Sequence, residues 1–135
     1  MEPGSTSFEL SVLPGAFAVC RMPPGSALPA WFHAGPFASS SWTAHEVSFV
    51  CAQDQLPAQG APRCERDWRC LMLHGPVPFE CTGVLSRILA PLARAEIGIF
   101  ATSTFDTDYV LVKGAALEAA IAALMEDGHR VHRTA

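Results

Sequence analysis

The sequence predicts an α+β fold of the ferredoxin-like class, in which a strand–helix–strand–strand–helix–strand unit (βαββαβ) occurs twice. Three observations lead to this prediction. Residues 68–133 carry short apolar runs and two helical patterns in that order. The 135 residues are 50% hydrophobic, enough for one or two small domains with buried cores. The two halves of the chain also resemble each other at an offset of about 60 residues, which indicates a tandem repeat.

The second half predicts the more regular unit. Residues 68–74 form an apolar run that Gly75 and Pro76 end, as expected of a strand. Residues 82–95 and 115–127 carry apolar side chains at helical spacing, and Pro91 removes one hydrogen bond from the first of these helices. Residues 129–133 alternate around a valine and predict a final edge strand.

Residues 96–113 predict a β-hairpin with an unusually polar tip. Two apolar runs, 97–101 and 109–112, are rich in β-branched and aromatic residues, as strands are. The turn between them carries more hydrogen-bonding groups than a turn needs. These groups are the hydroxyls of Thr102, Ser103, Thr104 and Thr107 and the carboxylates of Asp106 and Asp108.

The first half predicts a degraded copy of the same unit. Strands are expected over residues 7–13, 16–22 and 47–51, the first two as a hairpin around Pro14 and Gly15. Only a short helical turn fits residues 28–33, and residues 53–66 predict a connector. We therefore place an incomplete unit at residues 1–62 and a complete unit at residues 63–135. The matching segments are 8–15 with 68–75, 37–42 with 100–105, and 45–50 with 107–112.

Composition and charge exclude several function classes. The formal net charge is −4 with no cluster of Lys and Arg, so nucleic acid is not an expected partner. No apolar run reaches the ~20 residues of a membrane span, and residues 1–7 lack a signal core, so we expect a cytoplasmic protein. The five cysteines include no Cys-x-x-Cys pair. Cys20, Cys51 and Cys70 lie in apolar runs, which fits reduced, hydrophobic side chains in a reducing compartment.

Several segments resemble the ACT domains of the CASTOR type. The resemblance is specific around Phe79 to Val84, in the Ala-Pro-Leu-Ala run 90–93 and over residues 99–112, and it is looser before residue 68. That group includes cytosolic arginine sensors of animals and many small bacterial proteins. The resemblance implies paired ACT units with joined sheets and an amino acid bound at the seam between units. The animal sensors carry four ACT units, whereas this chain has about two, so a complete seam either requires a homodimer or is absent.

The resemblance also implies which residues hold the amino acid. The matching positions are Phe79, Thr82, Gly83, Val84, Ser103, Thr104, Phe105, Asp106 and Asp108. The chemistry of these residues stands without the family. Free N–H groups at a helix start, with Thr82 as the predicted N-cap, can bind a carboxylate, and Gly83 permits close approach. Asp106 and Asp108 can pair with an ammonium or guanidinium group. The alternative is a tight turn whose Asp and Thr side chains cap their own backbone.

Catalysis and metal binding are not predicted. The Asp106-x-Asp108 pattern resembles metal-binding turns but has no third ligand in the sequence, and the five histidines are scattered. His129 and His132 would point to opposite sides of a strand. Cys81 beside a helix start has no assignable base. We therefore expect no enzyme activity, no cofactor and no metal.

The sequence and the resemblance thus predict a regulatory or sensory module that binds a small molecule. A free amino acid is the expected ligand, and a downstream protein partner is expected to read the bound state. The alternative is a structural or protein–protein interaction module in which the ancestral ligand site is empty. A uniform lack of response to amino acids would favour this alternative.

Overall fold

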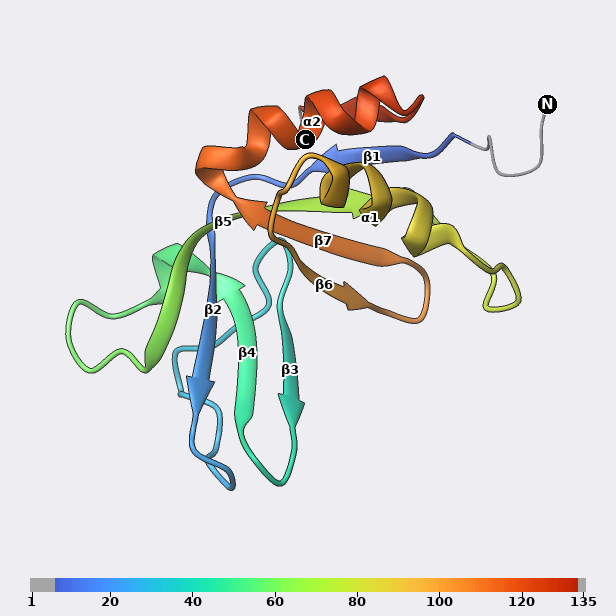
Figure 1. The fold of residues 1–135 in the computed structure, drawn as a ribbon. Coiled ribbons are helices and arrows are strands. Elements are labelled where there is room, and N and C mark those ends of the chain that lie inside the picture. The colour runs from blue at the N-terminus through green and yellow to red at the C-terminus, as the bar shows by residue number, and fades with distance from the viewer. Residues whose placement is uncertain (1–6, 134–135) are drawn as a thin grey trace. The chain divides into compact units, whose positions relative to one another are not determined.

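A computed structural model describes residues 7–133, and these residues form two compact units (Figure 1). Unit 1 contains residues 7–14 and 69–133, and unit 2 contains residues 15–68. Residues 1–6 and 134–135 lie outside the described residues. The sequence alone therefore supports the expectation, drawn from residues 1–7, that the N-terminus is not an export signal. Among the described residues, no helix is long and apolar enough to cross a membrane.

Unit 1 has the predicted βαββαβ order and one additional strand. Its sheet order is β8-β1-β5-β7-β6, so the additional strand β1 lies between the first and last strands of the repeat unit. β1 pairs antiparallel with β5, with Leu10 opposite Leu73, and parallel with β8, with Leu10 opposite Val131. The elements of unit 1 are β1 (Glu9–Val12), the end of β5 (Arg63–Leu73), α1 (Val84–Arg94), β6 (Phe100–Ser103), β7 (Asp108–Lys113), a 3₁₀ turn (Gly114–Ala116), α2 (Leu117–Glu126) and β8 (Arg130–His132).

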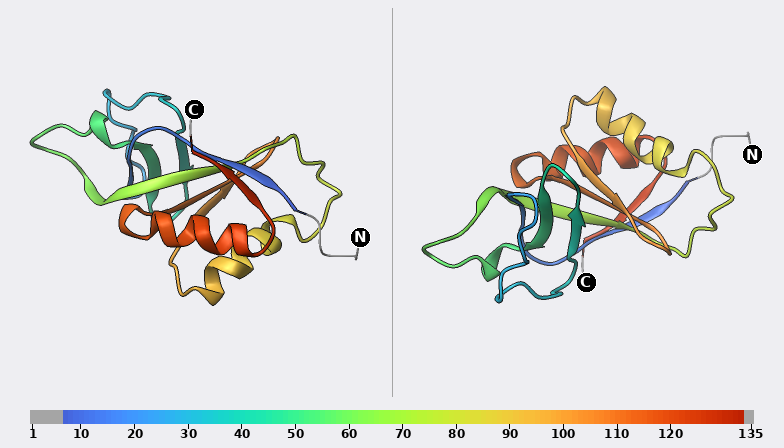
Figure 2. Two further views of the ribbon diagram at one scale, coloured as in Figure 1. Left: turned by 90° about the horizontal axis from the view of Figure 1, so that it is seen from above. Right: turned by 90° about the horizontal axis from the view of Figure 1, so that it is seen from below.

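The two helices of unit 1 cover one face of its sheet, as Figures 1 and 2 show. Ile88 and Leu92 of α1 and Leu124 of α2 are buried against Leu10 and Leu73 of the strands. These side chains recur at helical spacing in the helices and at every second position in the strands, which is why the sequence pattern predicted both kinds of element. On the opposite face, β1 carries Glu9 and Ser11 and β8 carries Arg130 and His132.

Unit 2 has the strand order of a ferredoxin-like unit without its helices. Its strands are β2 (Phe17–Met22), β3 (Ser39–Trp42), β4 (Val47–Ala52) and the start of β5, in the antiparallel order β3-β4-β2-β5. Residues 23–38 and a 3₁₀ turn (Gln53–Gln55) stand where the two helices would be. The α+β class with an incomplete N-terminal copy is therefore confirmed.

Two predictions about the first strand are wrong. β1 does not form a hairpin with β2, because β1 pairs with β5 and β8 instead. Nor are residues 8–13 and 68–74 equivalent strands of two sheets, because Leu10 and Leu73 are direct partners in one ladder. Both errors have one physical cause: an alternating strand buries its apolar face equally well against several neighbours, and the sequence does not name the neighbour.

The residue correspondence predicted between the two halves agrees with the structure for the central hairpins and differs from it for the first strand. The β3–β4 hairpin and the β6–β7 hairpin occupy the same place in the two units, as the sequence match predicted. The strand of unit 2 that corresponds to the end of β5 is β2 (Phe17–Met22), not the segment 8–15 that the sequence match indicated. The compact units accordingly divide the chain at residues 14 and 68, whereas the sequence placed its boundary at residue 62.

Three local predictions have clear outcomes. No helix forms over residues 28–33; residues 30–31 make a turn, since Pro29 interrupts the segment. The first helix begins at Val84 with Gly83 rather than Thr82 as its N-cap residue. All five cysteines are free thiols, and Cys20, Cys51 and Cys70 are buried, as expected of small hydrophobic side chains (the others are Cys64 and Cys81).

Candidate functional site

A cavity of about 250 Å³ in unit 1 lies where the loop before α1 meets the β6–β7 turn. Twelve residues line it, and they come from two short stretches of the chain. The lining residues are Val77, Pro78, Phe79, Cys81, Gly83, Val84, Leu85, Ser103, Thr104, Phe105, Thr107 and Asp108. Pockets for drug-sized ligands usually occupy roughly 300–1,000 Å³, so this cavity suits a small metabolite better than a nucleotide or peptide.

The loop is fastened to the turn by backbone contacts. The Val77 N–H donates to the Asp106 carbonyl at 2.7 Å, and the buried Thr107 hydroxyl donates to the Leu73 carbonyl at 2.8 Å. A Cβ atom at Gly75 would lie 2.9 Å from the Asp106 carbonyl oxygen, so only glycine fits there without displacement. These contacts hold the two walls of the cavity in a fixed relation.

The turn is self-capped and presents one carboxylate to the cavity. The Thr104 N–H and hydroxyl both donate to the Thr107 carbonyl, at 2.8 and 3.0 Å. The Ser103 hydroxyl donates to Asp108 at 2.5 Å. A carboxylate has about four acceptor positions, so Asp108 keeps capacity for a further donor from a ligand.

The other wall presents the N-terminus of α1. Gly83 adopts a left-handed conformation with φ of 74°, and no side chain caps the helix there. The first helical bond runs from the Arg87 N–H to the Gly83 carbonyl, so the N–H groups at Val84 and Leu85 have no partner within the helix. A Cβ atom at Gly83 would meet nothing within 4 Å, which leaves the helix start open on this side. The site therefore has a partial positive charge on this wall.

Two aromatic rings stand at the edge of the cavity. Phe79 and Phe105 meet edge to face, with ring centroids 4.9 Å apart. They are 72% and 79% exposed, among the most exposed large hydrophobic side chains in the described part of the chain. Exposed aromatic side chains in mutual contact beside a cavity are typical of a ligand- or partner-binding surface.

The structure brings together seven of the nine predicted site residues. Phe79, Gly83, Val84, Ser103, Thr104, Phe105 and Asp108 line the cavity, whereas Thr82 and Asp106 do not. Asp106 contributes its carbonyl to the anchoring of Val77. Five further lining residues were not among the predicted site residues: Val77, Pro78, Cys81, Leu85 and Thr107. The sequence signal for them was their closeness in the chain to the predicted site residues.

The arrangement can bind a small zwitterion, with one carboxylate and one helix start facing each other across a partly apolar space. The lining contains no Lys, Arg or His side chain, so an acidic ligand side chain would find no cationic partner there.

Comparisons with known proteins agree with this architecture. A family model described as an ACT domain matches residues 63–126, and a second model, for an N-terminal domain, matches residues 15–59. No curated protein matches the chain. Among solved structures, the regulatory subunit of aspartate kinase from Thermus thermophilus, in its ligand-free form, has a TM-score of 0.60 at 13% identity, covering 86% of this chain and 94% of that one.

Two small proteins match nearly end to end. A Vibrio cholerae protein of unknown function, described as a possible transport protein, has a TM-score of 0.67 at 18% identity, with 90% of each chain covered. The Thermus thermophilus and Vibrio cholerae structures are both less than 25% identical to this chain, so they show a shared fold. The protein Atu0741 from Agrobacterium tumefaciens has a TM-score of 0.88 at 34% identity, and the match covers 96% of both chains. The chain therefore belongs to the family of small ACT-domain proteins that includes Atu0741.

Proposed function

We propose that this chain is a non-catalytic regulatory module whose ACT domain binds a free amino acid in the cavity between α1 and the β6–β7 turn. One observation carries the proposal: the uncapped start of α1 and the carboxylate of Asp108 line the same small cavity. An α-carboxylate would accept from the N–H groups at Val84 and Leu85, and an ammonium or guanidinium group would donate to Asp108.

The cavity lining narrows the choice of amino acid. Phe79 and Phe105 offer aromatic faces to a cationic or apolar side chain, and a cation over such a face gains about 0.5–1 kcal/mol at an exposed site. A second carboxylate on the ligand would be repelled by Asp108. We therefore expect neutral or cationic amino acids to bind and aspartate and glutamate not to bind. The resemblance to the arginine sensors makes arginine the first candidate to test.

The available interactions limit the affinity. A carboxylate at a helix start gains up to ~1 kcal/mol, and a charge-assisted hydrogen bond to Asp108 contributes roughly 1.5–3 kcal/mol. Together with burial of apolar atoms against the phenylalanines, these terms correspond to dissociation constants between about 1 μM and 1 mM.

A homodimer would complete the site. β6 pairs only with β7 among the described strands, which leaves one edge of β6 without a partner in the ladder. Unpaired strand edges favour pairing with another chain. Because Ser103 ends β6 and lines the cavity, a second copy joined at this edge would lie beside the ligand and exclude water from it. A downstream protein partner would then read the bound state.

The test is a thermal-shift panel of the twenty amino acids, followed by calorimetric titration of those that raise the midpoint. A ligand at 100 times its dissociation constant stabilises the folded state by about 2.7 kcal/mol. Asp108→Asn should weaken binding about tenfold to 100-fold, because a charge-assisted bond is lost. Asp106→Asn is the matched control, since the Asp106 side chain does not line the cavity and binding should stay within about twofold of the parent.

One observation favours a different function. The exposed Phe79 and Phe105 rings could seat an apolar side chain of a protein partner rather than a free ligand. If no amino acid at millimolar concentration raises the thermal midpoint of the folded parent, the amino-acid proposal is wrong and the interaction module is favoured. Both aspartate variants should then also be folded.

A further inference from the structure

Three side chains distant in the sequence meet on the exposed face of unit 1: Glu9 of β1, His74 just after β5 and His132 of β8. The strand register explains the meeting. Leu10 lies opposite both Leu73 and Val131, and the His74 N–H donates to the Glu9 carbonyl at 2.8 Å. Because side chains alternate along a strand, the neighbours of these core residues all point away from the helices.

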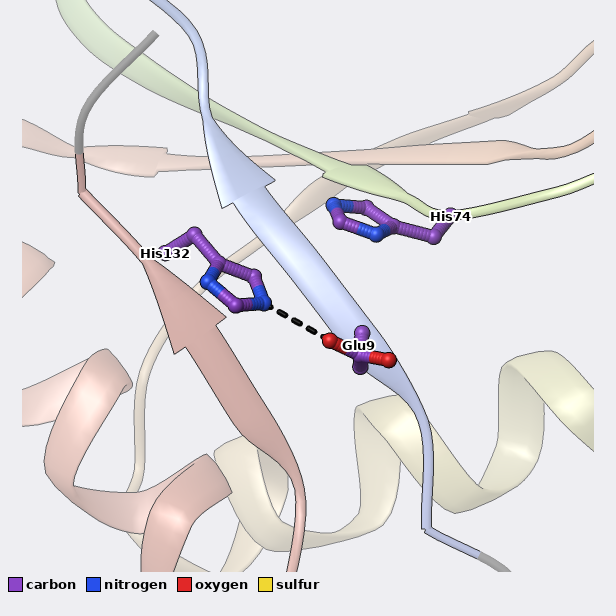
Figure 3. A group of neighbouring side chains, drawn as sticks. All are labelled: Glu9, His74 and His132. Carbon is purple, nitrogen blue, oxygen red and sulfur yellow. Dashed lines mark hydrogen bonds and ion pairs between the residues drawn. The ribbon is translucent and has the colours of Figure 1, made fainter.

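The ligand atoms of the three side chains lie near one another on this face (Figure 3). One carboxylate oxygen of Glu9 and one ring nitrogen of each histidine all lie within 4.8 Å of one another. Nε2 of His132 is 2.8 Å from Oε1 of Glu9, and the two imidazole rings are stacked with centroids 5.3 Å apart. We call these three residues the Glu9–His74–His132 cluster.

Two histidines and one carboxylate form a donor set that zinc prefers, with a fourth position left for water. Tetrahedral zinc with bonds of ~2.0–2.2 Å holds its ligand atoms roughly 3.5 Å apart. The most distant pair in the cluster must therefore close by roughly 1 Å, and the Glu9–His132 pair must open slightly. The side chains of Glu9 and His132 are about half exposed, so both can rotate into place.

The surroundings of the cluster support coordination. The Ser11 hydroxyl lies 2.6 Å from Nε2 of His74 and can accept that N–H, which leaves the lone pair on Nδ1. Arg130 lies opposite Glu9 on the same strand as His132, and its positive charge would oppose a metal ion.

We propose that the Glu9–His74–His132 cluster is a binding site for one divalent zinc ion. The site is separate from the cavity proposed for the amino acid and lies on the opposite face of the sheet from the helices. Its ligands come from β1, from β8 and from the residue that follows β5. Only the folded domain brings these three side chains together, so zinc bound there would stabilise the fold and would fasten β1 and β8 to the end of β5.

The experiment titrates zinc into untagged, metal-free, reduced protein by calorimetry and by competition with a chromogenic chelator. We expect one equivalent to bind near neutral pH and to raise the midpoint of thermal unfolding. His74→Ala and His132→Ala should each weaken zinc binding by at least about 100-fold, because second-sphere changes alone cost 10- to 100-fold. His45→Ala is the matched control, since His45 is exposed in unit 2 and lies outside the cluster.

A second readout separates this site from the cysteines. Cobalt substituted for zinc gives an intense thiolate charge-transfer band only when cysteine coordinates it. We expect the parent to lack this band. Glu9→Gln removes the carboxylate charge with little change in shape. This variant keeps the test available if an alanine variant unfolds, and circular dichroism shows which variants are folded. Zinc binding that is equal in the parent and in folded Glu9→Gln, His74→Ala and His132→Ala, or a thiolate band in the parent, would overturn the proposal. So would the absence of zinc binding to the parent.

Discussion

Replacing Thr107 with valine tests whether the β6–β7 turn is locked to the end of β5. Thr107 is only 8% exposed, and its hydroxyl donates to the Leu73 carbonyl at 2.8 Å. Valine has nearly the same shape but cannot donate, so the Leu73 carbonyl loses that bond inside the protein. Leaving a buried acceptor without its donor costs about 1–3 kcal/mol.

This cost is measurable by denaturation. A loss of 1 kcal/mol in the free energy of unfolding lowers the thermal midpoint by about 4–8 °C in domains of about 60–100 residues and by about 2–4 °C in domains of about 150–250 residues. For a chain of this length we take about 4 °C. Thr107→Val should therefore lower the midpoint by about 4–12 °C and reduce the urea midpoint without changing the slope. Thr107→Ser keeps the hydroxyl and should lose less stability than the valine variant.

A matched control and a local readout make the result specific. Thr102→Val changes a threonine on neighbouring β6 for which the described residues show no side-chain hydrogen bond, so stability should change by no more than about 0.5 kcal/mol. Amide exchange at Val77 should accelerate in Thr107→Val, because its acceptor, the Asp106 carbonyl, belongs to the loosened turn. Equal stability of the two valine variants would refute the reasoning that this hydroxyl joins the walls of the cavity.

Three further predictions concern packing and thiol chemistry. Gly75→Ala should destabilise the protein by about 1–3 kcal/mol, because its Cβ would lie 2.9 Å from the Asp106 carbonyl oxygen; an unchanged urea midpoint would contradict this. Leu92→Ala removes a fully buried side chain from the helix–sheet core and should cost about 2–5 kcal/mol in the same measurement. Iodoacetamide at pH 8 should modify exposed Cys81 first, as mass spectrometry would show. Burial raises the pKa of Cys70 to about 12, so its thiol should react only after unfolding, and early labelling of Cys70 would show that β5 opens in the native state.

The candidate cavity could be predicted largely from sequence because its walls are local. The polar tip of the β6–β7 hairpin lies within one continuous stretch, and the glycine that starts α1 lies within another. Turn chemistry and helix-start chemistry each depend on neighbouring residues, so both were visible in the chain. The choice between Asp106 and Asp108 was not visible, because it depends on the backbone conformation of the turn, which sets where each side chain points.

The placement of β1 could not be predicted because it depends on contacts distant in the sequence. Leu10 and Val12 identify an apolar face, but that face packs equally well beside β2 or between β5 and β8. The Glu9–His74–His132 cluster was missed for the same reason. The sequence predicted that His129 and His132 point to opposite sides of a strand, but the neighbours of His132 follow only from the register of the strands.

The missing helices of unit 2 bear on the stoichiometry that the proposed amino-acid binding would have. Trp31 and Phe32 pack edge-on against Phe49, with ring centroids 6.0 and 5.3 Å away, and these aromatic residues cover the core that a helix would otherwise cover. Unit 2 thus keeps a buried core but has no α-helix start to receive a carboxylate. A cavity beside Trp31 is lined by Arg21 and Arg63 and by no carboxylate side chain, so it lacks a partner for an ammonium group. The two halves share an ancestral strand order, but only unit 1 has both charges of the site. A titration with the preferred amino acid should therefore give one equivalent per chain, and two equivalents would show that the loop 23–38 can replace a helix N-terminus.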